Sequence, residues 1–373
     1  MNKIILLLVV TFCPALWAQT VIPGEVLAYY CPPCNNHCDD ETFEAAGKCD
    51  HCGMELTAMT AEQRTKQMEQ RKTIAFYLQN GVEVLDFAGP MEVFSYAGYE
   101  VFTVSKTKNP ILSQGILKIV PDYDISDAPQ ADIVAFFGGN SSAASGDPEV
   151  IKWVKSQKKA EYHFSVCTGA FVLAESGILD GKTVTTFHDA IEGLREGYPN
   201  TKVLDNVRFV DNGTVITTAG ISAGIDGALH LVAKLKGLPE ARMVAYYMEY
   251  DKWQPGEGLI LSENNPYDYE KLTKEELEEY EGTYEFEKGK TVTVIADQEG
   301  NTLYAVIEKQ LFPLYFKAKD EYVNTARQPV TFLREEGSVT GYKSNGLGPF
   351  KKLSNNVKDA RQLLEARSGL VKN

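Results

Sequence analysis

The feature that most constrains the fold is a series of short apolar runs between residues 73 and 250, separated by helical patterns. We expect strands at Ile74–Leu78, Tyr99–Val104, Ile133–Phe137, Tyr162–Val166 and Val215–Thr218. Strands that alternate with helices form a mostly parallel sheet covered by helices on both faces. The sequence therefore predicts an α/β fold, in which ligands bind at the carboxyl ends of the strands.

Length and charge limit the remaining interpretations. The chain has 373 residues and is 44% hydrophobic, so two or three domains with buried cores are expected. The formal net charge of −14 argues against nucleic acid or an anionic membrane as the partner, because both bind clustered Lys and Arg. A small molecule is the favoured partner.

The first residues have the features of a secretory signal. Lys3 gives a positive start, Ile4–Phe12 is apolar, and a cleavage site precedes Gln19. We therefore expect a signal peptide at 1–18 and a periplasmic or secreted protein. Lipid attachment at Cys13 is the alternative, although the bulky Phe12 precedes it. No membrane span is expected, because no later segment approaches the roughly 20 apolar residues that spanning requires.

Five cysteines lie close together near the N-terminus. Two close cysteine pairs separated by a short spacer can place four sulfurs around one tetrahedral ion. Zinc is the expected ion, and copper is the alternative because thiolates and Met54 are soft ligands. His37 and His51 are spare candidates. In an oxidising compartment disulfides are the competing interpretation, with one sulfur left unpaired. The candidate metal ligands are Cys31, Cys34, Cys38, Cys49 and Cys52.

This segment, 28–57, resembles the heavy-metal-binding domain of bacterial metal-handling proteins. The family pattern ends in a Cys-x-x-Cys-Gly-Met element, which matches Cys49–Met54. The first half departs from the pattern, because Pro33 and Cys34 stand where the family often has Met and His. Which four of the five cysteines bind the ion is therefore open.

A lone cysteine marks the candidate active site. Cys167 follows the apolar run Tyr162–Val166 and precedes Gly169 and a helical pattern. Backbone N–H groups and the helix dipole at such a junction favour the thiolate, which is the reactive form. A buried structural cysteine is the alternative. Asp86 and the pair Gly138–Gly139 follow two other predicted strands.

Several elements in this order resemble the PfpI superfamily, which has the class I glutamine-amidotransferase-like fold, in the branch of isonitrile hydratase and the sensor domains of AraC-type regulators. The matching elements are Asp86 with Gly89–Phe94, Phe136–Gly139, Cys167–Phe171, Thr185–His188 and Ala219–Asp226. The resemblance implies a flavodoxin-like sheet, a strained elbow that carries Cys167 as nucleophile, and no cofactor for catalysis. It also implies a homodimer.

The same resemblance assigns roles to individual residues. Asp86 would point at the Cys167 sulfur as a general acid, and Thr168 follows the nucleophile as in isonitrile hydratase, which counts against peptidase-like and glyoxalase-like activities. Backbone N–H groups of Gly139 and Thr168 would stabilise negative charge. His188 and Glu92 are weaker pocket candidates. Structural alternatives remain open, because Asp86 and Thr168 could cap helices and the glycines could serve a turn.

The resulting organisation has a linker helix at 58–72, the PfpI-like domain at 73–250 and a linker at 251–278. Residues 279–355 then carry short strand-like runs divided by Gly, Asp and Asn, which predict a small antiparallel barrel or sandwich. This part resembles the lipocalin-like accessory domains of exported bacterial hydrolases, and 356–373 forms a C-terminal helix or tail.

Two functions follow. The first is an exported cysteine-dependent enzyme that acts on a small carbon–nitrogen substrate, by hydrating an isonitrile to an N-substituted formamide through a Cys167 thioimidate, or by hydrolysis. The second is a non-catalytic protein that handles metal or senses oxidative or small-molecule stress through the same cysteine. After residue 250 the sequence has strand-like runs in place of a helix-turn-helix pattern, which, with the predicted signal, argues against transcriptional regulation.

Overall fold

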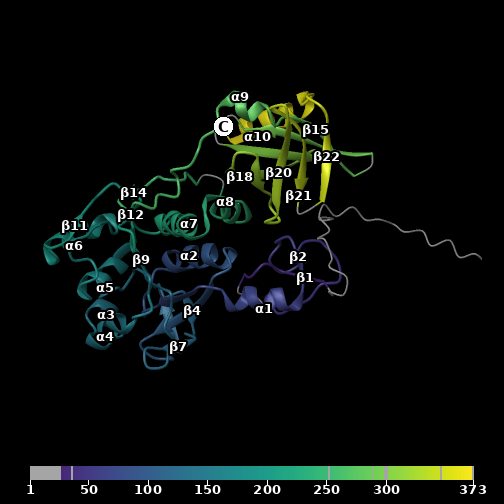
Figure 1. The fold of residues 1–373 in the computed structure, drawn as a ribbon. Coiled ribbons are helices and arrows are strands. Elements are labelled where there is room, and N and C mark those ends of the chain that lie inside the picture. The colour runs from purple at the N-terminus through teal and green to yellow at the C-terminus, as the bar shows by residue number, and fades with distance from the viewer. Residues whose placement is uncertain are drawn as a thin grey trace, which may run out of the picture. The chain divides into compact units, whose positions relative to one another are not determined.

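The computed structural model describes residues 27–34, 37–250, 253–287, 289–297, 301–344 and 347–371, without the side chains of 367–371. The predicted signal peptide and Cys13 lie outside these residues. The chain divides into two compact units, one built on Gln67–Lys271 and the other holding Asn36–Lys66 and the chain from Leu272 onward. Each is described by itself (Figure 1). Among the described residues, no helix is both long and apolar enough to cross a bilayer.

A twisted sheet of eight strands forms the centre of the unit Gln67–Lys271, in the order β14-β12-β13-β9-β8-β3-β4-β7. Neighbouring strands are parallel, except that β12 and β13 are antiparallel. The strands are β3 (Thr73–Tyr77), β4 (Glu100–Ser105), β7 (Tyr123–Asp124), β8 (Ile133–Phe136), β9 (Tyr162–Val166), β12 (Phe209–Asp211), β13 (Val215–Thr218) and β14 (Leu259–Ile260). The five predicted strands and the mostly parallel sheet are confirmed.

Helices cover both faces of this sheet. Phe76 belongs to the apolar cluster on one face and the next residue, Tyr77, to the cluster on the other, because side chains alternate along a strand. The first cluster includes residues of α2 (Val84–Tyr96), α7 (Ala223–Lys236) and α8 (Leu238–Tyr247). The second includes residues of α3 (Ser142–Ser145), α4 (Pro148–Ser156), α5 (Ala170–Glu175) and α6 (Ile191–Gly197).

Short elements complete this unit. Two small strand pairs form outside the main sheet, β5 (Ile111–Ser113) with β6 (Leu117–Ile119), and β10 (Thr183–Val184) with β11 (Lys202–Val203). Two 3₁₀ turns, η2 (Cys167–Gly169) and η3 (His188–Ala190), follow strand ends. The ladder pairs Tyr77 with Phe136 and Val166 with Thr218, so the carboxyl ends of β3, β8, β9 and β13 lie along one edge.

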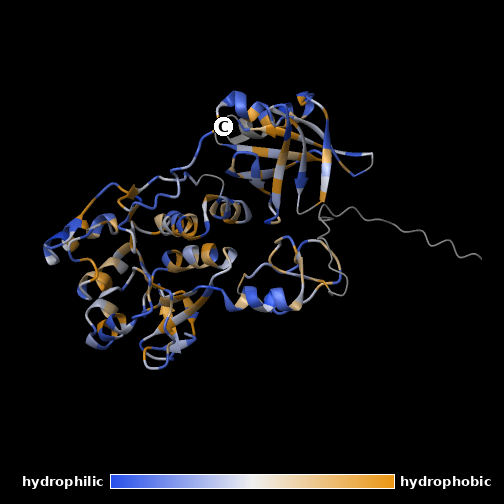
Figure 2. Cartoon of the chain, viewed as in Figure 1, coloured by the Kyte–Doolittle hydropathy of each residue, from blue (hydrophilic) through white to orange (hydrophobic). Residues whose placement is uncertain are grey.

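The cysteine-rich segment has little regular structure. β1 (Ala28–Tyr30) pairs with β2 (Thr57–Met59), and η1 (His37–Asp39) is a single 3₁₀ turn. The helix α1 (Ala61–Glu69) follows, within the predicted linker helix, and begins with reciprocal hydrogen bonds between Thr60 and Gln63. Figure 2 shows α1 as mainly hydrophilic, in contrast to the apolar strands of the large sheet.

The C-terminal part is a closed antiparallel barrel, so of the two predicted alternatives the barrel is confirmed. The helix α9 (Lys274–Glu278) precedes it with a capping box at Thr273, and α10 (Lys358–Val371) follows it. Buried aromatic rings pack together, with Tyr280 and Phe332 centroids 4.9 Å apart. The strands are β15 (Gly282–Glu287), β16 (Lys290–Ala296), β17 (Thr302–Ile307), β18 (Gln310–Ala318), β19 (Glu321–Val323), β20 (Pro329–Glu335), β21 (Ser338–Ser344) and β22 (Leu347–Ser354).

Candidate functional site

Cys167 sits on a strained elbow between β9 and α5. Its backbone φ is +58°, in the left-handed region that residues other than glycine seldom adopt. Hydrogen bonds hold the backbone on both sides: Cys167 N donates to Ala219 O (3.0 Å), and Thr186 Oγ1 donates to Cys167 O (2.7 Å). The elbow therefore aims the thiol at the carboxyl-end edge of the sheet, where only 5% of the residue is exposed.

Asp86, in the first turn of α2, is hydrogen-bonded to this thiol and is fully buried. Its two carboxylate oxygens accept different backbone donors: Gly138 N donates to Oδ2 and Ile221 N to Oδ1, both at 2.9 Å. Three chain segments thus fix the carboxyl group beside the sulfur. These bonds hold Asp86 in a different way from a helix cap.

The two groups form one coupled proton site. Burial raises the pKa of Asp86 to about 6, against the opposing hydrogen bonds from Ile221 and Gly138. Burial, and next the charge of Asp86, raise the pKa of Cys167 to about 12, although the N–H and hydroxyl of Thr168 favour its thiolate. At neutral pH the pair therefore holds one proton, and the thiolate forms when Asp86 takes that proton from sulfur.

This result corrects the expectation that backbone N–H groups and the helix dipole at this junction leave Cys167 as the thiolate, because the net pKa of the thiol is raised. The helix α5 has only six residues and begins three positions after Cys167, so its dipole is small and the burial of charge outweighs it.

The glycine pair after β8 makes the close approach of these groups feasible. A Cβ atom on Gly138 would lie 2.6 Å from Cys167 Sγ and 2.7 Å from Asp86 Oδ2, so the pair packs directly over this residue. Gly139 has φ +84°, and the turn is closed by Glu83 N donating to Gly138 O and Asn140 N donating to Gly81 O. Neither of these two bonds involves the N–H of Gly139.

Sequence reasoning missed Ile221 as a site residue. It lies between β13 and α7 with φ +56°, which is strained for a β-branched side chain. Its backbone N–H is one of the two donors to Asp86. The segment Ala219–Asp226 carries part of the family resemblance, but a backbone donor has no side-chain signature.

The two weaker pocket candidates, Glu92 and His188, are exposed to solvent. Glu92 is exposed on α2, and its role as a pocket residue stays a prediction. His188 is 76% exposed, forms an ion pair with Asp189 (2.6 Å) and packs on Phe187 with ring centroids 4.1 Å apart. Phe187 itself approaches the site, since a Cβ on Gly220 would lie 2.5 Å from its ring and 3.4 Å from Cys167 Sγ.

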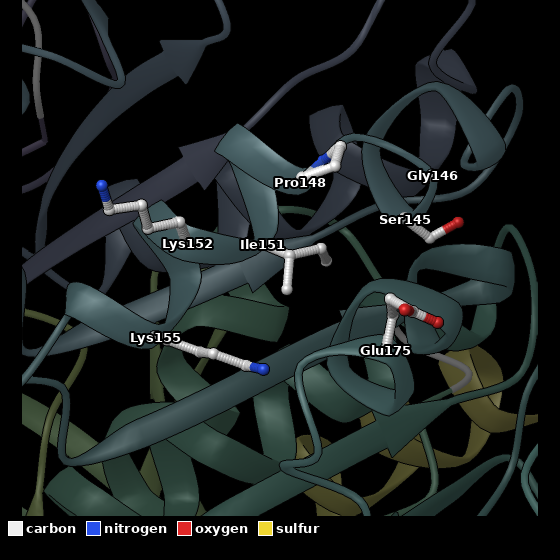
Figure 3. A pocket seen from close by; sticks show the side chains of 7 residues that line it. All are labelled: Ser145, Gly146, Pro148, Ile151, Lys152, Lys155 and Glu175. Carbon is white, nitrogen blue, oxygen red and sulfur yellow. The ribbon is translucent and has the colours of Figure 1, made fainter.

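A separate surface pocket lies on the helices α3, α4 and α5. It has a volume of about 530 Å³, and Figure 3 shows Lys152 and Lys155 on one side of it and Glu175 on the other. Neither Cys167 nor Asp86 lines this pocket, so it is separate from the candidate active site. The lining residues are Ser145, Gly146, Pro148, Ile151, Lys152, Lys155 and Glu175.

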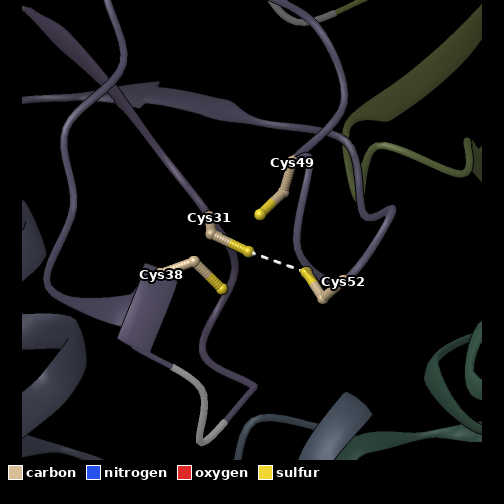
Figure 4. Close-up of side chains that lie close together, drawn as sticks. All are labelled: Cys31, Cys38, Cys49 and Cys52. Carbon is tan, nitrogen blue, oxygen red and sulfur yellow. Dashed lines mark hydrogen bonds between the residues drawn. The ribbon is translucent and has the colours of Figure 1, made fainter.

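Four of the five N-terminal cysteines point their sulfurs at a common centre (Figure 4). The Sγ atoms of Cys31, Cys38, Cys49 and Cys52 all lie within 4.8 Å of one another. Four thiolates about 2.3 Å from a zinc ion stand about 3.8 Å apart in a tetrahedron, so this donor set fits such an ion. Cys31 Sγ and Cys52 Sγ are 3.1 Å apart, well beyond the about 2.05 Å of a disulfide bond.

The loop around Cys49 is built to present its sulfur. Cys49 N donates to Met54 O and Gly53 N to Cys49 O, both at 2.8 Å. Burial raises the pKa of Cys49, but hydrogen bonds from Cys52 and His51 outweigh burial, so the net pKa is lowered. Cys34 belongs to a second group, in which its sulfur lies within 4.8 Å of Cys31, Cys38 and an Asp39 oxygen.

The fold and the site together define a class: α/β proteins with a cysteine on a strained elbow at the end of a parallel strand and a carboxyl partner from the first turn of the helix that follows β3. The chain belongs to the DJ-1/PfpI family, whose model matches residues 72–234. The heavy metal binding domain model matches residues 28–59.

Known proteins are similar to parts of this chain. The chain is 36% identical to isonitrile hydratase of Pseudomonas putida over 180 residues, which is 48% of this chain and 78% of the relative. It is 28% identical to the HTH-type transcriptional regulator CdhR of Pseudomonas aeruginosa over 169 residues, 43% of this chain and 50% of the regulator. The crystal structure of a ThiJ/PfpI family protein from Pseudomonas syringae matches with 29% identity and a TM-score of 0.46, over 50% of this chain and 77% of that one.

Proposed function

We propose that the chain is an exported cysteine-dependent enzyme that hydrates a small isonitrile to an N-substituted formamide. The observation that carries the proposal is that the Cys167 thiol and the Asp86 carboxyl lie together in a buried site beside Gly138, where burial raises the pKa of Asp86 to about 6. The likeness to isonitrile hydratase supports the substrate class. Export rests on the sequence of residues 1–18.

The first half of the reaction adds the thiol across the terminal isonitrile carbon. Asp86 takes the proton from Cys167 Sγ, the sulfur forms a bond to that carbon, and the carbon receives the same proton from the Asp86 carboxyl. The product is a thioimidate, in which sulfur is bonded to a CH group that is double-bonded to nitrogen. The single proton of the pair is consumed, and Asp86 becomes a carboxylate.

The second half releases the product. Asp86, now a base, takes one proton from a water molecule as the water oxygen bonds to the thioimidate carbon, and this proton passes to the substrate nitrogen. The hydroxyl of the tetrahedral intermediate then loses its proton to Asp86 while the carbon–sulfur bond breaks, which returns the shared proton to the pair. The N–H groups of Gly139 and Thr168 are the proposed donors to developing negative charge.

The decisive experiment measures formamide from an alkyl isonitrile. Wild type should form N-alkylformamide, Cys167→Ala should form none, and Asp86→Asn should react at least 100-fold more slowly, because general acid–base groups contribute about 10²–10⁴-fold. A matched control is Asp189→Asn, which changes an exposed carboxyl outside the pair. Equal turnover by wild type and Cys167→Ala would exclude the proposal.

The metal site has a separate proposed role. We assign one zinc ion to Cys31, Cys38, Cys49 and Cys52, as a structural or handled ion that does not take part in the Cys167 chemistry. When bound, it would hold the two loops of the cysteine-rich segment together. Copper is the alternative ion because all four ligands are soft.

The alternative function is a stress sensor in which Cys167 is modified and nothing is turned over. The cysteine-rich segment, which matches the heavy metal binding domain model, supports it. Hydrogen peroxide would oxidise the Cys167 thiol to a sulfenic acid, and its second oxygen would leave as water with the proton of the thiol. Sulfenic acid at Cys167 without turnover of any isonitrile would support the sensor, whereas turnover would support the enzyme.

We further propose that the chain is a homodimer. Exposed apolar side chains on and next to the β5–β6 hairpin support this: Ile116 is 78% exposed and Val120 is 65% exposed. Light scattering should give twice the monomer mass for wild type and the monomer mass for Ile116→Glu. A monomeric wild type would disprove it.

A further inference from the structure

A second group of metal-ligating side chains lies on the surface of the cysteine-rich segment, apart from the four sulfurs. It consists of His37, Glu41 and His51, whose ligand atoms all lie within 4.8 Å of one another. The His37 and His51 side chains are 65% and 38% exposed, and that of Glu41 is 43% exposed. We call these three residues the His–Glu cluster.

The distances in the His–Glu cluster suit one small ion. His37 Nε2 lies 3.2 Å from His51 Nε2, and His51 Nε2 lies 3.4 Å from Glu41 Oε2. Two ligand atoms about 2.1 Å from a tetrahedral ion stand about 3.4 Å apart. The third distance, from His37 Nε2 to Glu41 Oε1, is 3.9 Å.

Local backbone structure brings the ligands together. The turn η1 places His37 and Glu41 four residues apart on one side, through hydrogen bonds from Asp40 N to His37 O and from Glu41 N to Cys38 O. Arg64 supports this turn by donating to Asp39 O (2.6 Å). A ligand site on such a held turn needs little rearrangement to bind.

The second imidazole comes from the other cysteine loop. His51 lies between Cys49 and Gly53, in the turn closed by the hydrogen bond from Gly53 N to Cys49 O. His37 directly precedes Cys38, and His51 directly precedes Cys52. Because each histidine is next to a cysteine of the four-sulfur group, the approach of the two cysteine loops also brings the two imidazoles together.

We propose that the His–Glu cluster is a second metal site, which binds a divalent first-row transition ion through two imidazole nitrogens and one carboxylate. Imidazole and carboxylate ligands suit zinc and copper(II), whereas the four thiolates form the softer site. Three ligands with solvent-accessible side chains leave coordination positions for water, so this ion exchanges faster than the ion held by four sulfurs, three of which belong to buried residues. The cluster is thus an entry point for metal at the two loops that carry the cysteine ligands.

The test uses the full-length chain and zinc alone. Protein loaded with one equivalent of zinc is titrated with further zinc against a chromophoric chelator. Wild type should bind a second equivalent, and the double variant His37→Ala/His51→Ala should bind it at least about tenfold more weakly, since the loss of even a supporting group costs about 10–100-fold in metal affinity. The matched control is His188→Ala, which removes an exposed histidine paired with a carboxylate elsewhere.

Two further measurements keep the result specific. Cysteine alkylation should remain blocked by the first zinc equivalent in the double variant, which shows that the sulfur site is intact. The variant Glu41→Gln, which keeps the shape of the side chain, should also weaken the second equivalent. The proposal would be overturned if wild type bound only one equivalent of zinc, or if both variants bound the second equivalent with the affinity of wild type. These readouts do not depend on Cys167 or on any turnover.

Discussion

Asp86, near the start of the α/β domain, is hydrogen-bonded in a buried site to Cys167, near the middle of the domain. The Asp86 carboxyl also accepts hydrogen bonds from the backbone N–H groups of Gly138 and Ile221. The charge of Asp86 raises the pKa of Cys167, and the thiol hydrogen bond lowers the pKa of Asp86, so their protonation states are linked. The pair works as one acid–base unit.

The linked pair predicts the pH dependence of turnover. Activity needs one proton on the pair, and burial raises the pKa of Asp86 to about 6. Below pH 6 the pair takes up a second proton and the thiolate can no longer form, so kcat/KM should fall about tenfold per pH unit. Above pH 7 the profile should be level, because the pKa of Cys167 is raised to about 12. A rate that rises between pH 8 and 9 would instead indicate an independent thiol.

Gly138→Ala should separate catalysis from folding. The added Cβ would lie 2.6 Å from Cys167 Sγ and 2.7 Å from Asp86 Oδ2, so one of the two must move. We expect about 100-fold lower kcat/KM and a loss of about 1–3 kcal/mol in the free energy of unfolding. Both are measured by steady-state kinetics and urea denaturation. Gly197→Ala is the control, since its added Cβ meets nothing within 4 Å; equal activity of the two variants would refute the packing argument.

His163, in β9, should make the fold sensitive to mild acid. Burial lowers its pKa from 6.5 to about 4, so the stability it contributes is complete above pH 6.5 and is lost as the pH falls toward 4. The loss is at most about 3 kcal/mol.

The measurement is the urea midpoint of wild type and His163→Gln at pH 7 and pH 5. The stability of the variant relative to wild type should rise at the lower pH. Asp86, whose raised pKa acts in the opposite direction, is present in both proteins and cancels. No change in the relative stability would show that His163 remains solvated. His188→Gln, at an exposed histidine, should not reproduce the effect.

Substitution of single cysteines should identify the ligands of the proposed four-sulfur zinc site. Cys49→Ser takes away one of the four clustered sulfurs and should abolish the one-to-one complex with zinc, whereas Cys34→Ser should keep it. Competition with a chelator measures both. Loss of binding in Cys34→Ser with retention in Cys49→Ser would favour the group that contains Asp39.

The strands predicted from the sequence were those with long apolar runs. Ile133–Phe136 and Tyr162–Val166 are buried between two helical layers, so their residues are apolar on both faces and the runs are easy to recognise. β12 has only three residues, and β22 contains Gly348, Pro349 and two lysines, so neither has a clear pattern. Their positions are set by pairing with neighbouring strands.

The sequence predicted those site residues that act through their side chains. Cys167 and Asp86 were named from their places after strands and from the family resemblance. Glu92 lies six residues after Asp86 on α2, a rotation of roughly 120° around a helix, and its side chain is exposed. Ile221 acts through its backbone N–H, and the reluctance of the thiol to ionise depends on burial, so neither follows from residue types.

The closed barrel has a consequence for how the C-terminal domain meets other molecules. Each of its eight strands has a neighbour on both sides, with β22 returning to β15. Backbone groups along its wall are therefore already engaged, and the barrel has no open margin to which a foreign strand could be added. We therefore expect the barrel not to pair its strands with those of another chain. A protein that docks on the barrel would recognise its side chains or its connecting loops.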